Sequence, residues 1–141
     1  MTFEISITWI SKEFLKNMTH WVAQQVEIDP HRDLTVKFRN RKDSFSGVSF
    51  GGWIAIRIST NPCFCYPPFK RHGADAGDYS DRVEALVAIA AHEMQHVIQY
   101  RKGVIRKMTK KQKEQDAHKT EMRVKLLFRA QREALMAEWS R

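Results

Sequence analysis

The ten residues AHEMQHVIQY, from Ala91 to Tyr100, contain two histidines four residues apart, with a glutamate directly after the first. On a helix, positions i and i+4 lie on one face, one turn apart, so His92 and His96 could hold one tetrahedral Zn²⁺. Glu93 would project to the side, where it could reach a metal-bound water without ligating the metal itself. The HExxH pattern encodes this division of labour. The competing interpretation is two histidines and an acid on an ordinary helix.

The segment from about Ser80 to Tyr100 is expected to form a helix that is apolar on nearly all sides. At about 100° per residue, one side of this helix consists of Val83, Val87, Ala90, Met94 and Val97. The opposite side carries His92 and His96 among small residues. The helix should therefore be central, with both histidines facing an inner cleft. Burying these histidines and Glu93 without a partner would be costly, which favours the metal site over the ordinary helix.

A catalytic zinc also needs a third protein ligand and one open position, and the ligand is expected from the last long helix, about residues 111–139. Glu114 and Glu121 flank the apolar stripe of that helix, and His118 lies slightly further round. The two glutamates are two turns apart, about 10.5 Å by helix rise, so they cannot both be ligands. Glu121 would also form a favourable surface pair with Lys125, and Glu114 would favour the helix N-terminus. The stripe consists of Ala117, Val124, Phe128, Leu135 and Trp139.

The chain before the motif helix predicts one helix and a small antiparallel sheet of two to four strands. Ser11 is a suitable cap for a helix through residues 12–28. Alternating or β-rich segments predict strands at residues 34–39, 44–50 and 53–59, the last two joined by a two-residue hairpin turn at Gly51-Gly52. Together with the long loop 61–79, this order predicts a single α+β domain over residues 1–141.

The motif HEMQHVIQ, followed on the next helix by EQDAH, resembles the gluzincin type of zincin metallopeptidases. In many of these, a Glu-x-x-Ala-Asp pattern supplies the third ligand from its first residue. The resemblance thus implies that Glu114 is the ligand and that Ala117 lets the two helices approach. His118 stands where Asp is usual, which leaves it as an alternative ligand beside Glu121. The order of elements is also similar to the minimal zincin core of small phage- and plasmid-encoded metallopeptidases.

In that fold, the strand before the motif helix forms the rim of the cleft, and a peptide can pair with its exposed edge as an added strand. Residues 53–59 are the candidate, with Trp53 and Arg57 expected to bind substrate. An oxyanion stabiliser is also expected. The candidates for this role are Tyr66, His72, Tyr79 and Tyr100.

The formal net charge is +8, and the segment Arg101–Lys113 holds seven Lys or Arg residues and no acid. Such a segment favours an anionic partner, nucleic acid above all, although a solvated basic loop is the simpler interpretation. The two cysteines, Cys63 and Cys65, are too close for an unstrained disulfide, and reduced thiols are expected. With no apolar run of membrane length and no signal peptide, the protein is expected in the cytoplasm.

These observations predict a zinc-dependent peptidase that acts on a protein or peptide substrate. One alternative is a SprT-like protease acting on DNA-bound proteins, in which the basic segment holds DNA and His118 is the third ligand. Another is a non-catalytic structural or binding protein of a phage or mobile element that kept a zincin-like core.

Overall fold

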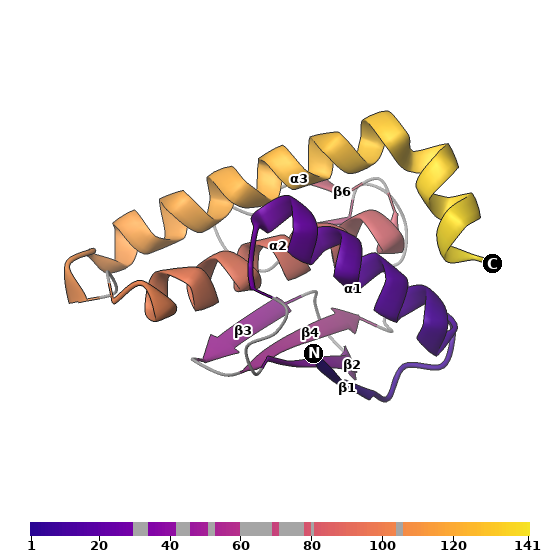
Figure 1. Ribbon diagram of the computed structural model, residues 1–141, viewed down its shortest axis with the longest axis horizontal. Coiled ribbons are helices and arrows are strands. Elements are labelled where there is room, and N and C mark those ends of the chain that lie inside the picture. The colour runs from indigo at the N-terminus through magenta and orange to yellow at the C-terminus, as the bar shows by residue number, and fades with distance from the viewer. Residues whose placement is uncertain are drawn as a thin grey trace.

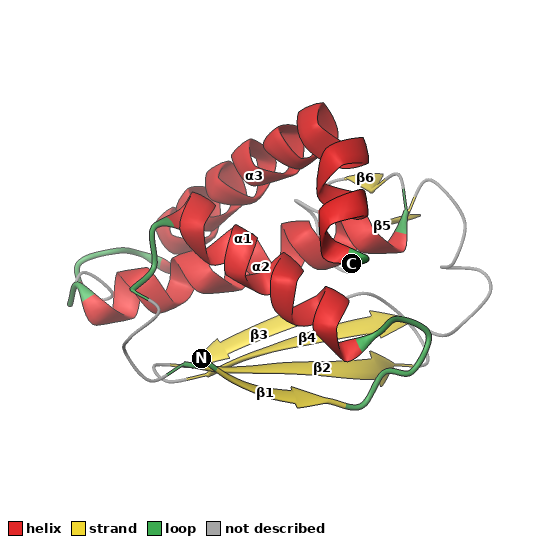
Figure 2. Cartoon of the chain, turned by 45° about the vertical axis from the view of Figure 1, so that its right-hand side comes forward, coloured by secondary structure: helices red, strands yellow, loops and turns green. Residues whose placement is uncertain are grey.

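The computed structural model describes residues 1–29, 34–41, 46–50, 53–59, 69–70, 78–79, 81–103 and 106–141. Within these ranges, a four-stranded sheet forms one layer, and all of the helices lie on one of its faces (Figures 1 and 2). The helices are α1 (Lys12–Val26), α2 (Arg82–Arg101) and α3 (Lys110–Trp139). The sheet contains β1 (Thr2–Ile5), β2 (Thr35–Arg41), β3 (Ser46–Phe50) and β4 (Trp53–Ser59), and a separate pair consists of β5 (Phe69–Lys70) and β6 (Asp78–Tyr79).

The strand order of the sheet is β1-β2-β4-β3, and the prediction of an antiparallel sheet was wrong. Strands β1, β2 and β4 run parallel, and only β3 runs antiparallel, against β4. The N-terminal strand β1 was not predicted, although Phe3 and Ile5 alternate with polar residues; α1 serves as the crossover that makes β1 and β2 parallel. The β3–β4 hairpin then places β4, and not β3, beside β2.

This order also corrects the prediction that residues 53–59 form the rim of the cleft. Strand β4 is paired on both sides, with β2 and β3, so it is an interior strand. In the described sheet, β3 is the edge strand on the side of α2. The connection at Gly51-Gly52, predicted as a two-residue turn, lies outside the described residues.

Helix α1 begins and ends with identifiable caps. The Ser11 hydroxyl accepts a hydrogen bond from the Phe14 amide at 3.1 Å, as the sequence predicted. At the other end, Glu27 adopts a left-handed conformation with φ of 63°, and the following Ile28 amide returns to the Ala23 carbonyl at 3.1 Å. This is the geometry in which helices usually place glycine. The buried face of α1 packs against α2 and α3.

Helix α2 is the centre of the fold. Asp81 caps it by accepting a hydrogen bond from the Glu84 amide at 2.9 Å, and every residue from Glu84 to Met94 is buried. The sheet covers one side of α2, and α1 and α3 cover the others (Figure 2). The prediction of a central helix that is apolar on nearly all sides is confirmed.

Helix α3 begins with a capping box between Thr109 and Gln112, and the whole predicted apolar stripe is buried. It is tied to the start of α2 by ion pairs of Arg129 with Glu84 and of Arg132 with Asp81. The hydrogen bond that Arg129 donates to buried Glu84 raises the pKa of the guanidinium, which is therefore charged at any ordinary pH. None of the helices in the described part of the chain has the length and hydropathy of a membrane span.

Candidate metal centre

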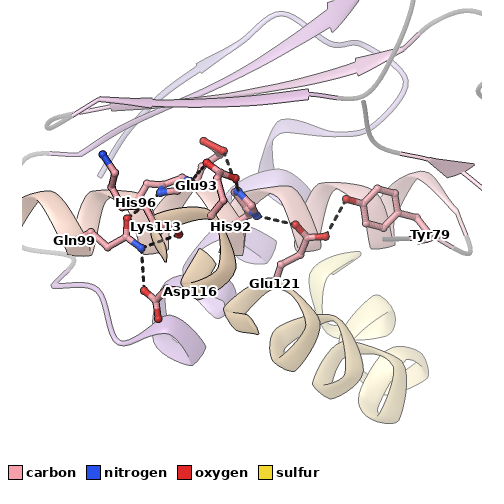
Figure 3. A network of polar contacts seen from close by, with 9 residues as sticks. Tyr79, His92, Glu93, His96, Gln99, Lys113, Asp116 and Glu121 are labelled. Atoms are coloured by element: carbon pink, nitrogen blue, oxygen red, sulfur yellow. Dashed lines mark hydrogen bonds and ion pairs between the residues drawn. The ribbon is translucent and has the colours of Figure 1, made fainter. Parts of the chain in front are cut away.

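The two motif histidines project from α2 toward α3 and lie one turn apart (Figure 3). Their ring centroids are 4.9 Å apart, and the His92 side chain is almost fully buried. From α3, one carboxylate oxygen of Glu114 lies 3.1 Å from His92 Nε2 and the other lies 3.0 Å from His96 Nε2. One ligand atom from each of the three residues can be chosen so that all lie within 4.8 Å of one another. The structure therefore brings together a His-His-Glu group with the spacing of a metal site.

The Nδ1 atom of His92 faces away from this group and meets a buried carboxylate. His92 Nδ1 lies 2.9 Å from Glu121 Oε1, and the Tyr79 hydroxyl donates to Glu121 Oε2 at 3.1 Å (Figure 3). The Glu121 side chain is only 1% exposed, so its charge depends on these donors. A carboxylate accepts and does not donate, so His92 carries its proton on Nδ1. Nε2, on the other side of the ring, faces the Glu114 carboxylate, and it is the atom that a metal ion would bind in place of a proton.

The second histidine is oriented in the same way by an amide. His96 Nδ1 lies 2.9 Å from Gln99 Oε1, while Gln99 Nε2 donates to Asp116 at 2.9 Å and to the Lys113 carbonyl at 3.1 Å. These two acceptors fix which end of the amide faces the imidazole, because only the NH₂ group can donate to them. The amide oxygen therefore accepts from His96 Nδ1–H. The Gln95 amide also donates to Asp116, at 2.9 Å.

The donor set fits a bound divalent metal. Two imidazole lone pairs and a carboxylate converge on one point, and acceptors that face one another are stable only with a cation or additional protons between them. Zinc takes two histidines and one glutamate in catalytic sites and leaves one position open for water or substrate. The hydrogen bonds to both Nδ1 atoms are the outer contacts that metal-bound histidines usually make. His92, His96 and Glu114 would hold the ion.

Glu93 lies beside this group without belonging to it. Its side chain is 4% exposed, and Oε1 is 4.0 Å from His92 Nε2. The edge strand β3 passes directly over it at Gly47. A Cβ atom placed on Gly47 would lie 2.6 Å from Glu93 Cγ and 2.8 Å from Ile89 Cγ2. The absence of a side chain at Gly47 is thus what allows β3 to approach Glu93 so closely.

The two alternative third ligands, Glu121 and His118, lie outside the His-His-Glu group. Glu121 binds the far side of His92 and so supports the metal group from outside it. His118 is half-buried on α3, and the described residues give it no place in the His-His-Glu group. The structure thus brings together the first choice of the sequence analysis, His92, His96 and Glu114.

Of the two residues predicted to bind substrate, the described structure places only Trp53, which lies away from this centre. Trp53 lies on the sheet face opposite α2, because its neighbour Ile54 points into the core, and the Lys37 amine lies 4.3 Å from the Trp53 ring centroid. The Arg57 side chain lies outside the described residues. Trp53 and Arg57 remain predictions without support from a contact.

Of the oxyanion candidates, Tyr79 is buried and directs its hydroxyl to Glu121. Tyr100 is exposed on α2, four residues after His96, and remains a prediction. Four further predicted positions, Tyr66 and His72 in the loop and the thiols of Cys63 and Cys65, lie outside the described residues.

Sequence reasoning missed the residues that orient the histidines. Gln99 follows His96 by three positions, a spacing that places the two side chains on one helical face, so this contact had a signal. Asp116 lies on α3, and the side chains that donate to it, Gln95 and Gln99, come from α2. Nothing in the local sequence pairs Tyr79 with Glu121, because the contact spans 42 positions. Gly47 could not be recognised as a contact of Glu93 before the strand order was known.

The chain matches no known protein-family model, and comparisons with curated proteins and with solved structures find no match. The interpretation of the centre therefore rests on its residues and their geometry.

Proposed function

We propose that this protein is a zinc-dependent metallopeptidase in which His92, His96 and Glu114 bind the metal and Glu93 is the general base. The observation that carries the proposal is the convergence of the three ligands, with both histidine Nδ1 atoms held by hydrogen bonds, beside a buried carboxylate that is not itself a ligand. Histidines that only pack in a core do not require both Nδ1 atoms to be hydrogen-bonded while both Nε2 atoms face a shared carboxylate.

The chemistry of peptide hydrolysis assigns a role to each side chain. Zinc, when bound, polarises the substrate carbonyl and lowers the pKa of a water molecule in the open position. Glu93 accepts the proton of that water as it attacks, and then delivers it to the amine that leaves. Glu121 stabilises positive charge on His92, and Gln99 fixes the ring of His96.

The edge strand β3 supports a peptide as the substrate. In the described sheet, β3 pairs only with β4, so its other edge is available to an extended chain. A peptide that joins this edge as an added strand forms main-chain hydrogen bonds regardless of its sequence. Because Gly47 brings β3 against Glu93, such a peptide would pass close to the general base. This role replaces the one that the sequence had given to residues 53–59.

Metal analysis combined with Glu93→Gln tests the proposal. Purified wild-type protein should contain about one zinc per chain, in keeping with a single three-ligand site. It should cleave an unstructured protein such as casein, whereas Glu93→Gln should keep the zinc and lose the cleavage. Glu133→Gln, an exposed change of the same type on α3, is the matched control and should behave as wild type. Folded wild-type protein that does not bind zinc would refute the proposal.

Alanine substitutions on α3 test the ligand assignment. Glu114→Ala should abolish stoichiometric zinc binding, because it removes one of three ligands. Glu121→Ala should weaken binding without abolishing it. His118→Ala should bind zinc as the wild type does. Loss of zinc with His118→Ala and its retention with Glu114→Ala would instead assign the third ligand of the SprT-like alternative.

A protease that acts on DNA-bound proteins is the second candidate function, because the basic segment Arg101–Lys113 could bind DNA. The described lysines and arginines of this segment are mostly exposed. Such a protein would bind DNA with an affinity that falls steeply as salt increases, and DNA would stimulate cleavage. The non-catalytic alternative predicts no hydrolysis of any peptide, and a folded protein without zinc would favour it. Cleavage assays with and without duplex DNA separate the three.

A further inference from the structure

A cleft of about 820 Å³ opens on the N-terminal part of α3, next to the metal centre. Its described lining consists of Lys110, Lys111, Glu114, Gln115, His118 and Lys119. Glu114 belongs to both sites, since its half-exposed side chain borders the cleft and its carboxylate contacts both histidines. The cleft and the candidate metal group therefore share one side chain, Glu114.

The described lining of the cleft carries a net positive charge, with three lysines against one glutamate. The acids of this part of α3 are both engaged, because Glu114 contacts the histidines and Asp116 accepts hydrogen bonds from α2. The three cleft lysines are exposed, and none of them forms an ion pair with a described residue. When a divalent cation offsets the charge of Glu114, the cleft wall becomes more positive still. An anionic group is the natural complement of such a surface.

We propose that this cleft binds acidic side chains of the substrate and gives the enzyme a preference for peptide bonds flanked by Asp or Glu. The inference rests on the proposed peptidase function. Because the cleft shares Glu114 with the metal centre, a peptide bound at the metal continues into it, and its carboxylates come within reach of Lys110, Lys111 and Lys119. A nucleic acid would use the whole basic segment instead, including Lys102 and Lys107, which lie outside the cleft lining.

Peptide binding to zinc-loaded Glu93→Gln protein tests this without requiring turnover. Two fluorescein-labelled peptides are compared, one with glutamates flanking a central hydrophobic pair and one with glutamines in the same positions. The acidic peptide should bind about tenfold more tightly, the sum of three exposed ion pairs of ordinary strength. Replacing Lys110, Lys111 and Lys119 together by Gln should remove the difference.

A second triple variant controls for net charge. Replacing Lys102, Arg106 and Lys107 by Gln also removes three positive charges, but from exposed positions outside the cleft lining. The preference for the acidic peptide should remain in this variant. Equal binding of both peptides to the parent protein would overturn the proposal. The proposal would also fail if both triple variants lost the preference for the acidic peptide to the same extent. So would a DNA oligonucleotide that binds more tightly than the acidic peptide and weakens equally in both variants.

The peptidase function is judged separately, by turnover of the wild-type protein. If wild-type protein binds zinc but cleaves no peptide, while the acidic preference and its dependence on the three cleft lysines persist, the peptidase proposal fails. The cleft then remains a site for acidic peptides. If cleavage occurs, the cleaved bonds in a mixed peptide library should be enriched in neighbouring Asp and Glu. Cleavage without that enrichment would refute the preference alone.

Discussion

Replacing Gly47 by Ala should impair catalysis while leaving the metal bound. Gly47 lies on the edge strand β3, and a methyl group there would meet Glu93 Cγ at 2.6 Å and Glu93 Cδ at 2.9 Å. Its third near neighbour is Ile89 of α2, at 2.8 Å. None of these atoms belongs to His92, His96 or Glu114. The perturbation is therefore aimed at the proposed general base and spares the three proposed ligands.

The size of the effect follows from the distances. An ordinary van der Waals contact of a Cβ atom begins near 3.4 Å, so Glu93 and β3 must separate by about 0.8 Å. Ile89 is fully buried and cannot move aside freely, so much of this displacement should fall on the Glu93 side chain or on β3. A misplacement of about 1 Å at a reacting group lowers the rate about 100-fold. Overpacking of this kind should also lower the free energy of unfolding by about 1–3 kcal/mol.

Steady-state kinetics on a cleaved peptide, together with zinc titration, measure both parts of this prediction. We expect a fall in kcat of about two orders of magnitude, a smaller change in KM and an unchanged zinc affinity. Gly103→Ala is the control, since it adds the same methyl group where nothing lies within 4 Å, at a glycine with φ of 69°. It should lower stability and leave kcat unaltered. A Gly47→Ala protein with wild-type kcat would show that the close approach of β3 does not position Glu93.

Three further predictions concern residues that support the site or the fold. Glu121→Gln should weaken zinc binding about 10- to 100-fold, because it removes the charge that polarises the metal-bound His92. Tyr79→Phe should weaken it by less, because it removes only the hydrogen bond that orients Glu121. Competition with a chelator measures zinc affinity in both variants. Glu84→Gln should lower the free energy of unfolding by about 1.5–3 kcal/mol in urea denaturation, because it weakens the hydrogen bonds that Arg129 donates to a buried carboxylate. Glu27→Gly should raise it by about 0.5–1 kcal/mol, because glycine adopts the left-handed conformation without strain. An unchanged midpoint would contradict either stability prediction.

The helices and the metal group could be predicted because their information is local. The 3.6-residue repeat that buries the stripe of α3 also fixes where Glu114 and Glu121 lie relative to it. The i and i+4 spacing of His92 and His96 needs only that α2 is a helix. The apolar residues on nearly all sides of this helix predicted that α2 would be central, and its burial from Glu84 to Met94 confirms this.

The sheet could not be predicted in the same way, because strand order depends on pairings between distant segments. A period of two in the sequence gives the two faces of a strand and does not give its neighbours or their direction. Strand β1 pairs with β2 across more than thirty positions, and β4 enters between β2 and β3. The error had a functional consequence, since it assigned the rim of the site to β4. Strand β3, with Gly47, occupies that place.

The position of the outer carboxylate links the metal centre to the cleft. In the zincin pattern that the sequence resembles, an Asp stands one turn after the ligand, at the place of His118. Here the carboxylate on His92 comes from Glu121, two turns after Glu114, where it is buried and held by Tyr79. A carboxylate in such an environment interacts more strongly with the imidazole than one exposed to water. Because buried Glu121 supplies the carboxylate that contacts His92, no acid is needed at position 118 for that contact. The His118 imidazole lines the cleft instead. The departure from the pattern thus removes an acid from the cleft wall, which favours the acidic substrate inferred for it.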